Sequence, residues 1–229
     1  MRSVRVLVVL VVVVALSPLA SAGLLVEDFE SYAAGSSLHG QGGWKGWDNA
    51  SAGTASVSTA QAYSGANSVA ITGGADLIHE FDETGGNLEL SAMQYIPDGA
   101  SGQSFFILLN QYNDGGPYDW SVQLNCNMDT GSIVSDQGGG SSLPLIKDQW
   151  VQLKFVIDLD GNTVDEYYDG TLLSTHQWDD NNHGTLGAID LFANGASPVY
   201  YDNITLVPEP ATLALLGMGG LALLRRRRQ

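Results

Sequence analysis

Apolar and polar residues alternate along most of the chain between residues 23 and 207. The clearest case is residues 150–158, where Val151, Leu153, Phe155 and Ile157 fall on one face and polar residues fall mainly on the other. This pattern predicts a half-buried strand. Turn residues follow at 160–162 and 169–170, around short runs at 163–168 and 171–173, so the segment predicts a three-stranded meander.

The same alternation recurs elsewhere between residues 23 and 207. Further strands are expected at residues 24–29, 55–58, 68–71, 77–81, 88–95, 104–110, 120–125, 132–135, 186–192 and 199–207. Clusters of Gly, Asn, Asp, Ser and Pro separate them and predict loops, for example at 113–117 and 138–141. No segment of this region has a convincing amphipathic helical pattern. Many short strands without helices predict an all-β antiparallel sandwich or barrel in one domain.

The first 22 residues have the pattern of a secretory signal. Arg2 and Arg5 precede an unbroken apolar run at 6–16, which predicts a short helix. Ala20 and Ala22 then form the small-x-small pattern that signal peptidase recognises. We expect residues 1–22 to be removed during export, with an uncleaved anchor as the alternative.

The last 23 residues, 207–229, have the pattern of a membrane address. They contain Pro208, Glu209 and Pro210, an apolar run of 14 residues at 211–224, and four arginines: Arg225, Arg226, Arg227 and Arg228. The run predicts a transmembrane helix about 21 Å long, short for a hydrocarbon core of about 30 Å. The basic cluster predicts a cytoplasmic C-terminus before processing. A plain tail anchor or a buried terminal helix is the alternative.

This order of Pro-Glu-Pro, apolar segment and arginine cluster resembles the PEP-CTERM sorting domain of exosortase substrates. The resemblance implies recognition by an exosortase in the inner membrane and cleavage near the motif. It also implies delivery to the cell surface, the outer membrane or an extracellular polysaccharide matrix.

The net charge of residues 23–207 limits the kinds of molecule that this region can bind. Residues 23–207 carry 24 acidic residues against Lys45, Lys147 and Lys154, a formal charge of −21. Nucleic-acid binding is excluded because it needs a basic surface. The acidic excess fits a solvated exterior or cation binding. Cys126 is the sole cysteine, and we expect it to be a small buried apolar residue.

The region 23–206 also resembles the concanavalin A-like, or laminin-G-like, jelly-roll superfamily. The likeness rests on Asp28-Phe29-Glu30, on Trp150 with its alternating strand, on 167–170 and on Tyr201-Asp202-Asn203-Ile204. It implies two curved antiparallel sheets with the first and last strands close together. Members are mostly carbohydrate-binding modules, glycosidases, lyases or adhesion domains.

Two kinds of site follow as expectations. The resemblance implies a structural Ca²⁺ between the terminal strands, with Asp28, Glu30 and Asp202 as ligands, and oxygen donors suit calcium. Aromatic residues in or beside loops are candidates for stacking on sugar rings. These candidates are Trp44, Trp47, Tyr118, Trp120 and Trp178. The alternative for each aromatic residue is that it caps an end of the core.

No catalytic residues are predicted. The segment Glu80-Phe81-Asp82-Glu83 departs from the Glu-x-Asp-x-(x)-Glu strand of laminarinase-type members, because Glu80 and Glu83 face opposite sides of a strand. The four histidines lack metal-binding spacing. We therefore expect an exported, non-catalytic sandwich that binds carbohydrate or associates with extracellular polysaccharide. The alternatives are an adhesion protein without a sugar site, and a secreted glycoside hydrolase or polysaccharide lyase.

Overall fold

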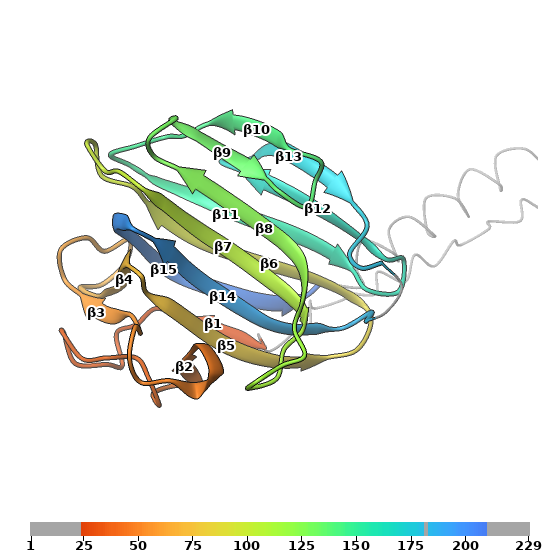
Figure 1. Cartoon of the computed structure of the whole chain (residues 1–229), viewed down its shortest axis with the longest axis horizontal. Coiled ribbons are helices and arrows are strands. Elements are labelled where there is room, and N and C mark those ends of the chain that lie inside the picture. Colours follow the sequence, from red (N-terminus) through yellow and green to blue (C-terminus); the bar gives the residue numbers. More distant parts are fainter. Residues whose placement is uncertain (1–23, 181–182, 210–229) are drawn as a thin grey trace, which may run out of the picture. The chain divides into compact units, whose positions relative to one another are not determined.

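Two antiparallel sheets pack face to face in the computed structural model, which describes residues 24–180 and 183–209 (Figure 1). The predicted all-β sandwich is confirmed. The expected signal helix and the expected transmembrane helix at 211–224 lie outside the described residues. Within residues 24–180 and 183–209, no helix is long and apolar enough to cross a bilayer.

The eight-stranded sheet has the order β13-β12-β11-β6-β15-β4-β3, with β1 also paired to β15. Its strands are β1 (Leu25–Glu27), β3 (Ser56–Ser58), β4 (Ser68–Gly73), β6 (Asn87–Tyr95), β11 (Trp150–Asp158), β12 (Thr163–Tyr168), β13 (Thr171–His176) and β15 (Ala196–Pro208). The β11-β12-β13 part is the predicted meander. The last strand runs from Ala196 to Pro208, whereas the sequence pattern predicts residues 199–207.

The seven-stranded sheet has the order β10-β9-β8-β7-β14-β5-β2. Its strands are β2 (Trp44–Gly46), β5 (Asp76–Glu83), β7 (Gln103–Gln111), β8 (Asp119–Asn127), β9 (Ser132–Ser135), β10 (Ser141–Pro144) and β14 (Leu186–Asn194). Strands β2 and β10 fall where the sequence pattern predicts loops, so that expectation was wrong. Both are short edge strands of three and four residues, too short for an alternating pattern to emerge.

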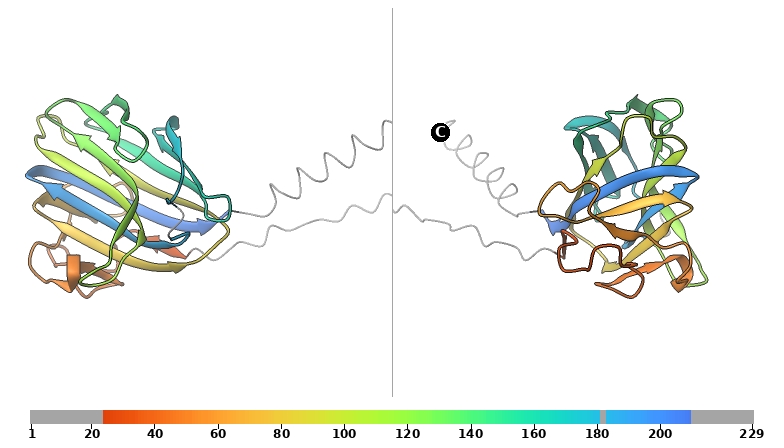
Figure 2. Two further views of the ribbon diagram at one scale, coloured as in Figure 1. Left: turned by 45° about the vertical axis from the view of Figure 1, so that its right-hand side comes forward. Right: turned by 90° about the vertical axis from the view of Figure 1, so that its left-hand side faces the viewer.

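The two sheets face each other (Figure 2). The main core consists of the side chains that they bury between them. Phe106 of β7 stacks on Phe155 of β11 with ring centroids 5.2 Å apart, which joins the sheets near their centre. Cys126 is fully buried in this core, and burial raises the pKa of its thiol to about 12. A second, smaller apolar cluster lies on the outer face of the seven-stranded sheet and includes Ile78, Phe105, Ile107 and Leu109.

The first and last strands are neighbours, as the superfamily resemblance implies. In the antiparallel pair β1–β15, Leu25 is opposite Leu206 and Glu27 is opposite Ile204. The Leu24 N–H donates to the Leu206 carbonyl at 2.8 Å. The described chain therefore begins and ends at one place in the eight-stranded sheet.

Candidate functional site

Four aromatic side chains gather at one end of the outer face of the seven-stranded sheet. We call Trp47, Tyr112, Tyr118 and Trp120 the first aromatic cluster. The Trp47 ring lies 4.6 Å from Tyr118 and 5.2 Å from Tyr112, between centroids. The Trp47 and Trp120 rings are nearly parallel, at 14° and 6.3 Å. Trp120 is 38% exposed, so it presents an aromatic surface to solvent.

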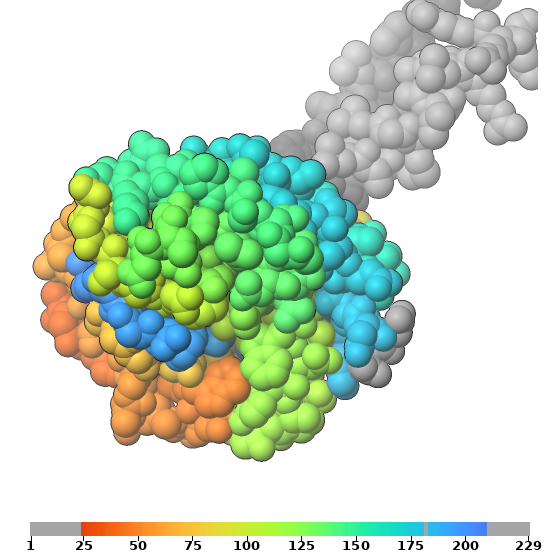
Figure 3. Space-filling view, turned by 45° about the horizontal axis from the view of Figure 1, so that its top comes forward, coloured from red at the N-terminus to blue at the C-terminus, as the bar shows by residue number. Residues whose placement is uncertain are grey.

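Two loops hold this cluster together, and they lie side by side in Figure 3, orange against light green. Asp48 joins them, because its Oδ1 accepts from the Gly115 N–H at 2.9 Å and from the Tyr118 hydroxyl at 2.5 Å. Asp48 has φ 54, a left-handed conformation that Asp tolerates better than most residues. Lys45 adds a second link, because its Nζ lies 2.7 Å from Asp114 Oδ1 and 2.5 Å from Glu80 Oε1.

A pair of acidic residues, Asp76 of β5 and Asp190 of β14, lies beside the cluster. Asp190 is 3% exposed, and its carboxyl group lies within reach of the Asp76 carboxyl group. Burial raises the pKa of Asp190 well above its ordinary value, and the charge of Asp76 raises it further. Burial also raises the pKa of Asp76, although the hydrogen bond from Asp190 opposes that shift. The Oδ1 atoms of both residues are buried and have no hydrogen-bond partner.

The aromatic cluster and the acidic pair border one cavity of about 240 Å³. Its lining is Trp47, Asp76, Ile107, Trp120, Gln123, Asp190 and Phe192. An exposed indole ring therefore stands next to carboxyl oxygens with unused hydrogen-bonding capacity. This combination of an apolar platform with a few oriented polar groups is typical of small-molecule and sugar sites.

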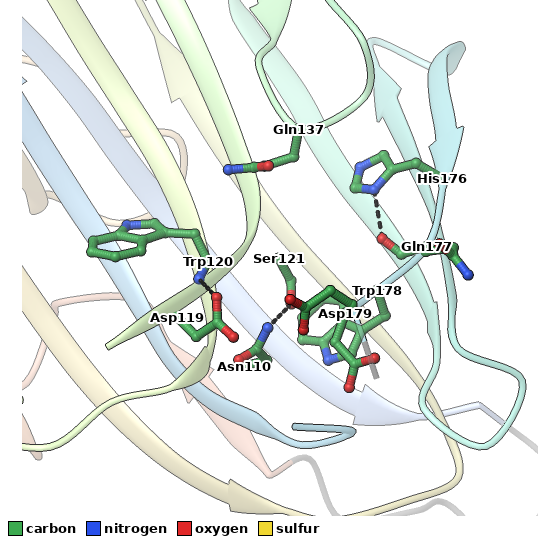
Figure 4. Close-up of a pocket in the computed structure, with 10 residues that line it drawn as sticks. Asn110, Asp119, Trp120, Ser121, Gln137, His176, Gln177, Trp178 and Asp179 are labelled. Atoms are coloured by element: carbon green, nitrogen blue, oxygen red, sulfur yellow. Dashed lines mark hydrogen bonds between the residues drawn. The ribbon is translucent and has the colours of Figure 1, made fainter. Parts of the chain in front are cut away.

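A second, more polar pocket of about 440 Å³ lies on the other side of Trp120. Asn110, Ser121, Trp178 and Asp179 converge in it, while Gln137 and His176 form its far wall (Figure 4). The Asn110 amide donates to Ser121 Oγ at 3.0 Å, but Asn110 Oδ1 is buried without a partner. Trp120 lines both hollows, which makes it the link between them.

Behind the polar pocket, His176 Nε2 lies 3.0 Å from Glu166 Oε1, and Glu166 is fully buried. Burial lowers the pKa of His176, but the hydrogen bonds to Glu166 and to the Gln177 carbonyl, together with the charge of Glu166, outweigh burial, and the net shift of the pKa is upward. Neither this pair nor the acidic pair was singled out from the sequence. The sequence pattern could have indicated Glu166. It occupies an inward position of β12 between Val164 and Tyr168, where a charged residue is unusual.

The structure divides the five predicted sugar-stacking residues. It brings Trp47, Tyr118 and Trp120 together in the first aromatic cluster. It buries the other two, and the expectation that they stack on sugars was wrong. Trp44 is 1% exposed and its indole N–H donates to Glu27 Oε2 at 3.1 Å. Trp178 is 1% exposed and its indole N–H donates to the Thr185 carbonyl at 2.9 Å.

The three carboxylates predicted to bind calcium accept hydrogen bonds from backbone N–H groups. Asp202 accepts from Tyr63 and Ser64, at 2.8 and 3.0 Å. Glu30 Oε1 accepts from two N–H groups of the β3–β4 connection, and Asp28 Oδ1 accepts from Glu30. In the described ranges, no group of three His, Cys, Asp or Glu side chains is arranged to hold a metal ion. Calcium binding therefore stays a prediction.

The sorting residues lie partly within the described chain. Pro208 ends β15 and Glu209 follows it. Pro210, Arg225, Arg226, Arg227 and Arg228, like Ala20 and Ala22 of the signal, lie outside the described residues.

Comparison with known proteins gives one family match. Residues 206–228 match the PEP-CTERM protein-sorting motif, which directs export and sorting to the cell surface. No curated protein matches the sequence.

Several solved structures share the fold. A sialidase is 10% identical, with a TM-score of 0.53, over 77% of this chain and 18% of its own length. An endo-β-1,4-glucuronan lyase from the fungus Trichoderma reesei is 10% identical, with a TM-score of 0.52, over 82% of this chain and 96% of its own. At these identities the likeness shows the fold alone. The chain thus combines a PEP-CTERM sorting motif with a jelly-roll β-sandwich.

Proposed function

We propose that the sandwich is a non-catalytic polysaccharide-binding domain displayed at the cell surface through its sorting motif. The observation that carries the proposal is the exposed Trp120 ring, nearly parallel to Trp47, beside a cavity with two unpartnered carboxyl oxygens. A sugar ring offers an apolar face for the indole and hydroxyl groups for the polar side chains that line the cavity. The jelly-roll fold, which carbohydrate-binding modules and lectins also use, agrees with this assignment.

The charges around the site favour neutral or amino-bearing glycans over acidic ones. Asp48, Asp76, Asp114 and Asp119 lie in or beside the cluster. The nearest lysine, Lys45, is already held by two carboxylates. An anionic polymer would meet like charge there with no free cation to offset it, which is unfavourable. The glucuronan lyase shares the fold at 10% identity, but acidic polymers of that kind fit this surface poorly.

The acidic pair does not have the arrangement of a retaining glycosidase. Such enzymes place two carboxyl groups about 5–5.5 Å apart, on either side of the scissile bond. Asp190 is instead only 3% exposed and the Oδ1 atoms of both residues are buried, so the pair does not present two accessible carboxyl groups to a glycosidic bond. A binding role fits this pair better than cleavage.

Retention on a panel of polysaccharides tests the proposal. The purified domain would be applied to a neutral β-glucan, to chitosan and to alginate, while the release of reducing ends is measured. We expect retention on the first two and not on alginate, without release. Retention on none would contradict sugar binding for these polymers, and release of reducing ends would favour the hydrolase or lyase alternative.

The variant Trp120→Ala locates the site. We expect retention to weaken at least about tenfold, which corresponds to about 1.4 kcal/mol. Tyr63→Ala is the matched control, because Tyr63 is also an exposed aromatic residue, 50% accessible, but lies at the eight-stranded sheet. Equal losses in both variants would contradict the assignment to the first aromatic cluster.

A further inference from the structure

The sorting motif and the folded sandwich overlap in the chain. The motif match begins at residue 206, whereas β15 continues to Pro208. Leu206, Val207 and Pro208 therefore belong to both. Leu206 is fully buried in the core between the sheets. The first residues of the matched sorting motif are thus part of the last strand of the domain.

Backbone pairing extends through the first two residues of Pro-Glu-Pro. Val207 is opposite Glu89 and Pro208 is opposite Leu88 in the β15–β6 ladder. Beyond the strand, the Glu209 N–H still donates to the Asn87 carbonyl at 2.9 Å. The ladder to β6 therefore runs to Glu209.

The chemistry of Pro-Glu-Pro limits the hydrogen bonds that this part of the chain can donate. Proline has no N–H, so neither Pro208 nor Pro210 can donate to a sheet. Within Pro-Glu-Pro, only Glu209 has a backbone N–H, and this N–H donates to the Asn87 carbonyl. Pro208 and Glu209 therefore lie at the end of the described last strand and also belong to the recognition signal.

A processing enzyme binds its substrate as an extended chain, often through the same backbone groups that a sheet uses. Groups already paired within a folded domain are not available without local unfolding. We propose that processing cuts the chain at the Glu209–Pro210 bond or beyond it, so that the released domain keeps Pro208 and Glu209 in its sheet.

The covalent step is an ordinary acyl transfer. The carbonyl carbon of the scissile peptide bond forms a new bond to the oxygen of water or the nitrogen of an amine acceptor. The C–N bond breaks, and the leaving nitrogen takes the proton that the acceptor loses. Nothing is oxidised or reduced.

The mass of the processed protein tests the proposal directly. The full chain would be expressed in cells that contain the exosortase, and the C-terminal peptide of the released protein would be identified by mass spectrometry. We expect a peptide that includes Glu209. A C-terminus at or before Pro208 would overturn the proposal, and so would a protein that is never cleaved.

A disulfide across the end of the ladder provides a second test that leaves Pro-Glu-Pro itself unchanged. Glu89→Cys and Val207→Cys place two thiols at directly opposed positions of β6 and β15. The native Cys126 is fully buried and does not compete. We expect the cross-linked protein to be processed to the same extent as the single variant Glu89→Cys. Processing blocked by the cross-link and restored by a reductant would show that β15 must detach first, and would overturn the proposal.

Discussion

Two aromatic clusters lie on opposite outer faces of the sandwich, and they are built alike. The second aromatic cluster consists of Tyr63, Tyr95, Trp150 and Tyr200 at the eight-stranded sheet, with Trp150 5.5 Å from Tyr95 and 5.8 Å from Tyr63. Each cluster is tied down by an aspartate with a positive φ, 54° for Asp48 and 56° for Asp148. Asp148 Oδ1 accepts from the Asp98 N–H at 2.7 Å and from the Tyr95 hydroxyl at 3.4 Å, as Asp48 does for Gly115 and Tyr118.

The clusters differ in the polar groups around them. Among the described residues, six buried side-chain atoms have no hydrogen-bond partner, and three of them border the hollows on either side of Trp120. These three belong to Asp76, Asn110 and Asp190. No residue of the second cluster contributes such an atom in the described chain. Exposed aromatic rings alone therefore do not distinguish a binding site; unused hydrogen-bonding capacity beside them does.

The largest expected effect is on glycan retention, when the aspartate that holds each cluster is replaced in a separate variant. Asp48→Gly removes the hydrogen bonds that hold Tyr118 and the 113–117 loop, while glycine accepts the positive φ without strain. We expect glycan retention to weaken about thirtyfold, or about 2 kcal/mol, because the platform loses its fixed geometry. Asp148→Gly makes the equivalent change in the second cluster and should leave retention unchanged. Affinity electrophoresis compares the two variants, and similar losses would remove the functional distinction between the clusters.

A smaller effect is expected on stability, from the acidic pair. Because the folded-state pKa of Asp190 is raised, the native state holds a proton that the unfolded chain releases above its ordinary pKa of 3.8. Wild-type stability should therefore fall, relative to Asp190→Asn, as pH rises above that value. We expect the variant to gain stability relative to the wild type between pH 5 and pH 8, because the wild-type native state must give up its proton or keep it at a growing free-energy cost. Urea denaturation at both values measures this, and a pH-independent difference would contradict the assignment.

The smallest expected effect concerns the predicted calcium site, which would act on the second cluster. Asp202 accepts from the Tyr63 N–H, so an ion bound by Asp202 would stabilise the loop that carries Tyr63. A chelator should then lower the melting temperature by about 2–4 °C, as expected for about 1 kcal/mol in a domain of this size. Retention by the first cluster should not change. An unaltered melting temperature would argue against a structural ion.

The strand pattern predicted the sandwich well, because alternation reports directly which face of a strand is buried. In β11, all four predicted inward residues are buried, and the meander lies where the turn residues placed it. The site was less predictable, because exposure depends on what the rest of the chain places over a residue. Trp44 and Trp47 are three residues apart in the same glycine-rich segment, yet only Trp44 enters the core.

The acidic pair shows a second limit of the sequence pattern. Asp76 and Asp190 lie 114 positions apart and meet only because β5 and β14 are neighbours, with Asp190 opposite Ile78. The alternation of apolar and polar residues shows which face of a strand is buried, but it does not show which strands become neighbours in a sheet. Asp190 alone had a recognisable signal, a carboxylate within the apolar run of β14.

The position of β15 has a mechanical consequence. A protein attached to a surface through its C-terminal end, before or after processing, would receive any pulling force along this strand. Strand β15 is hydrogen-bonded to β6 on one side, and to β4 and then β1 on the other. A force along the axis of β15 loads its backbone hydrogen bonds in shear, so many of them resist together. In a hairpin pulled from one end, the hydrogen bonds instead break one after another. The attachment point of the chain is thus the strand best placed to carry a load into the whole sheet.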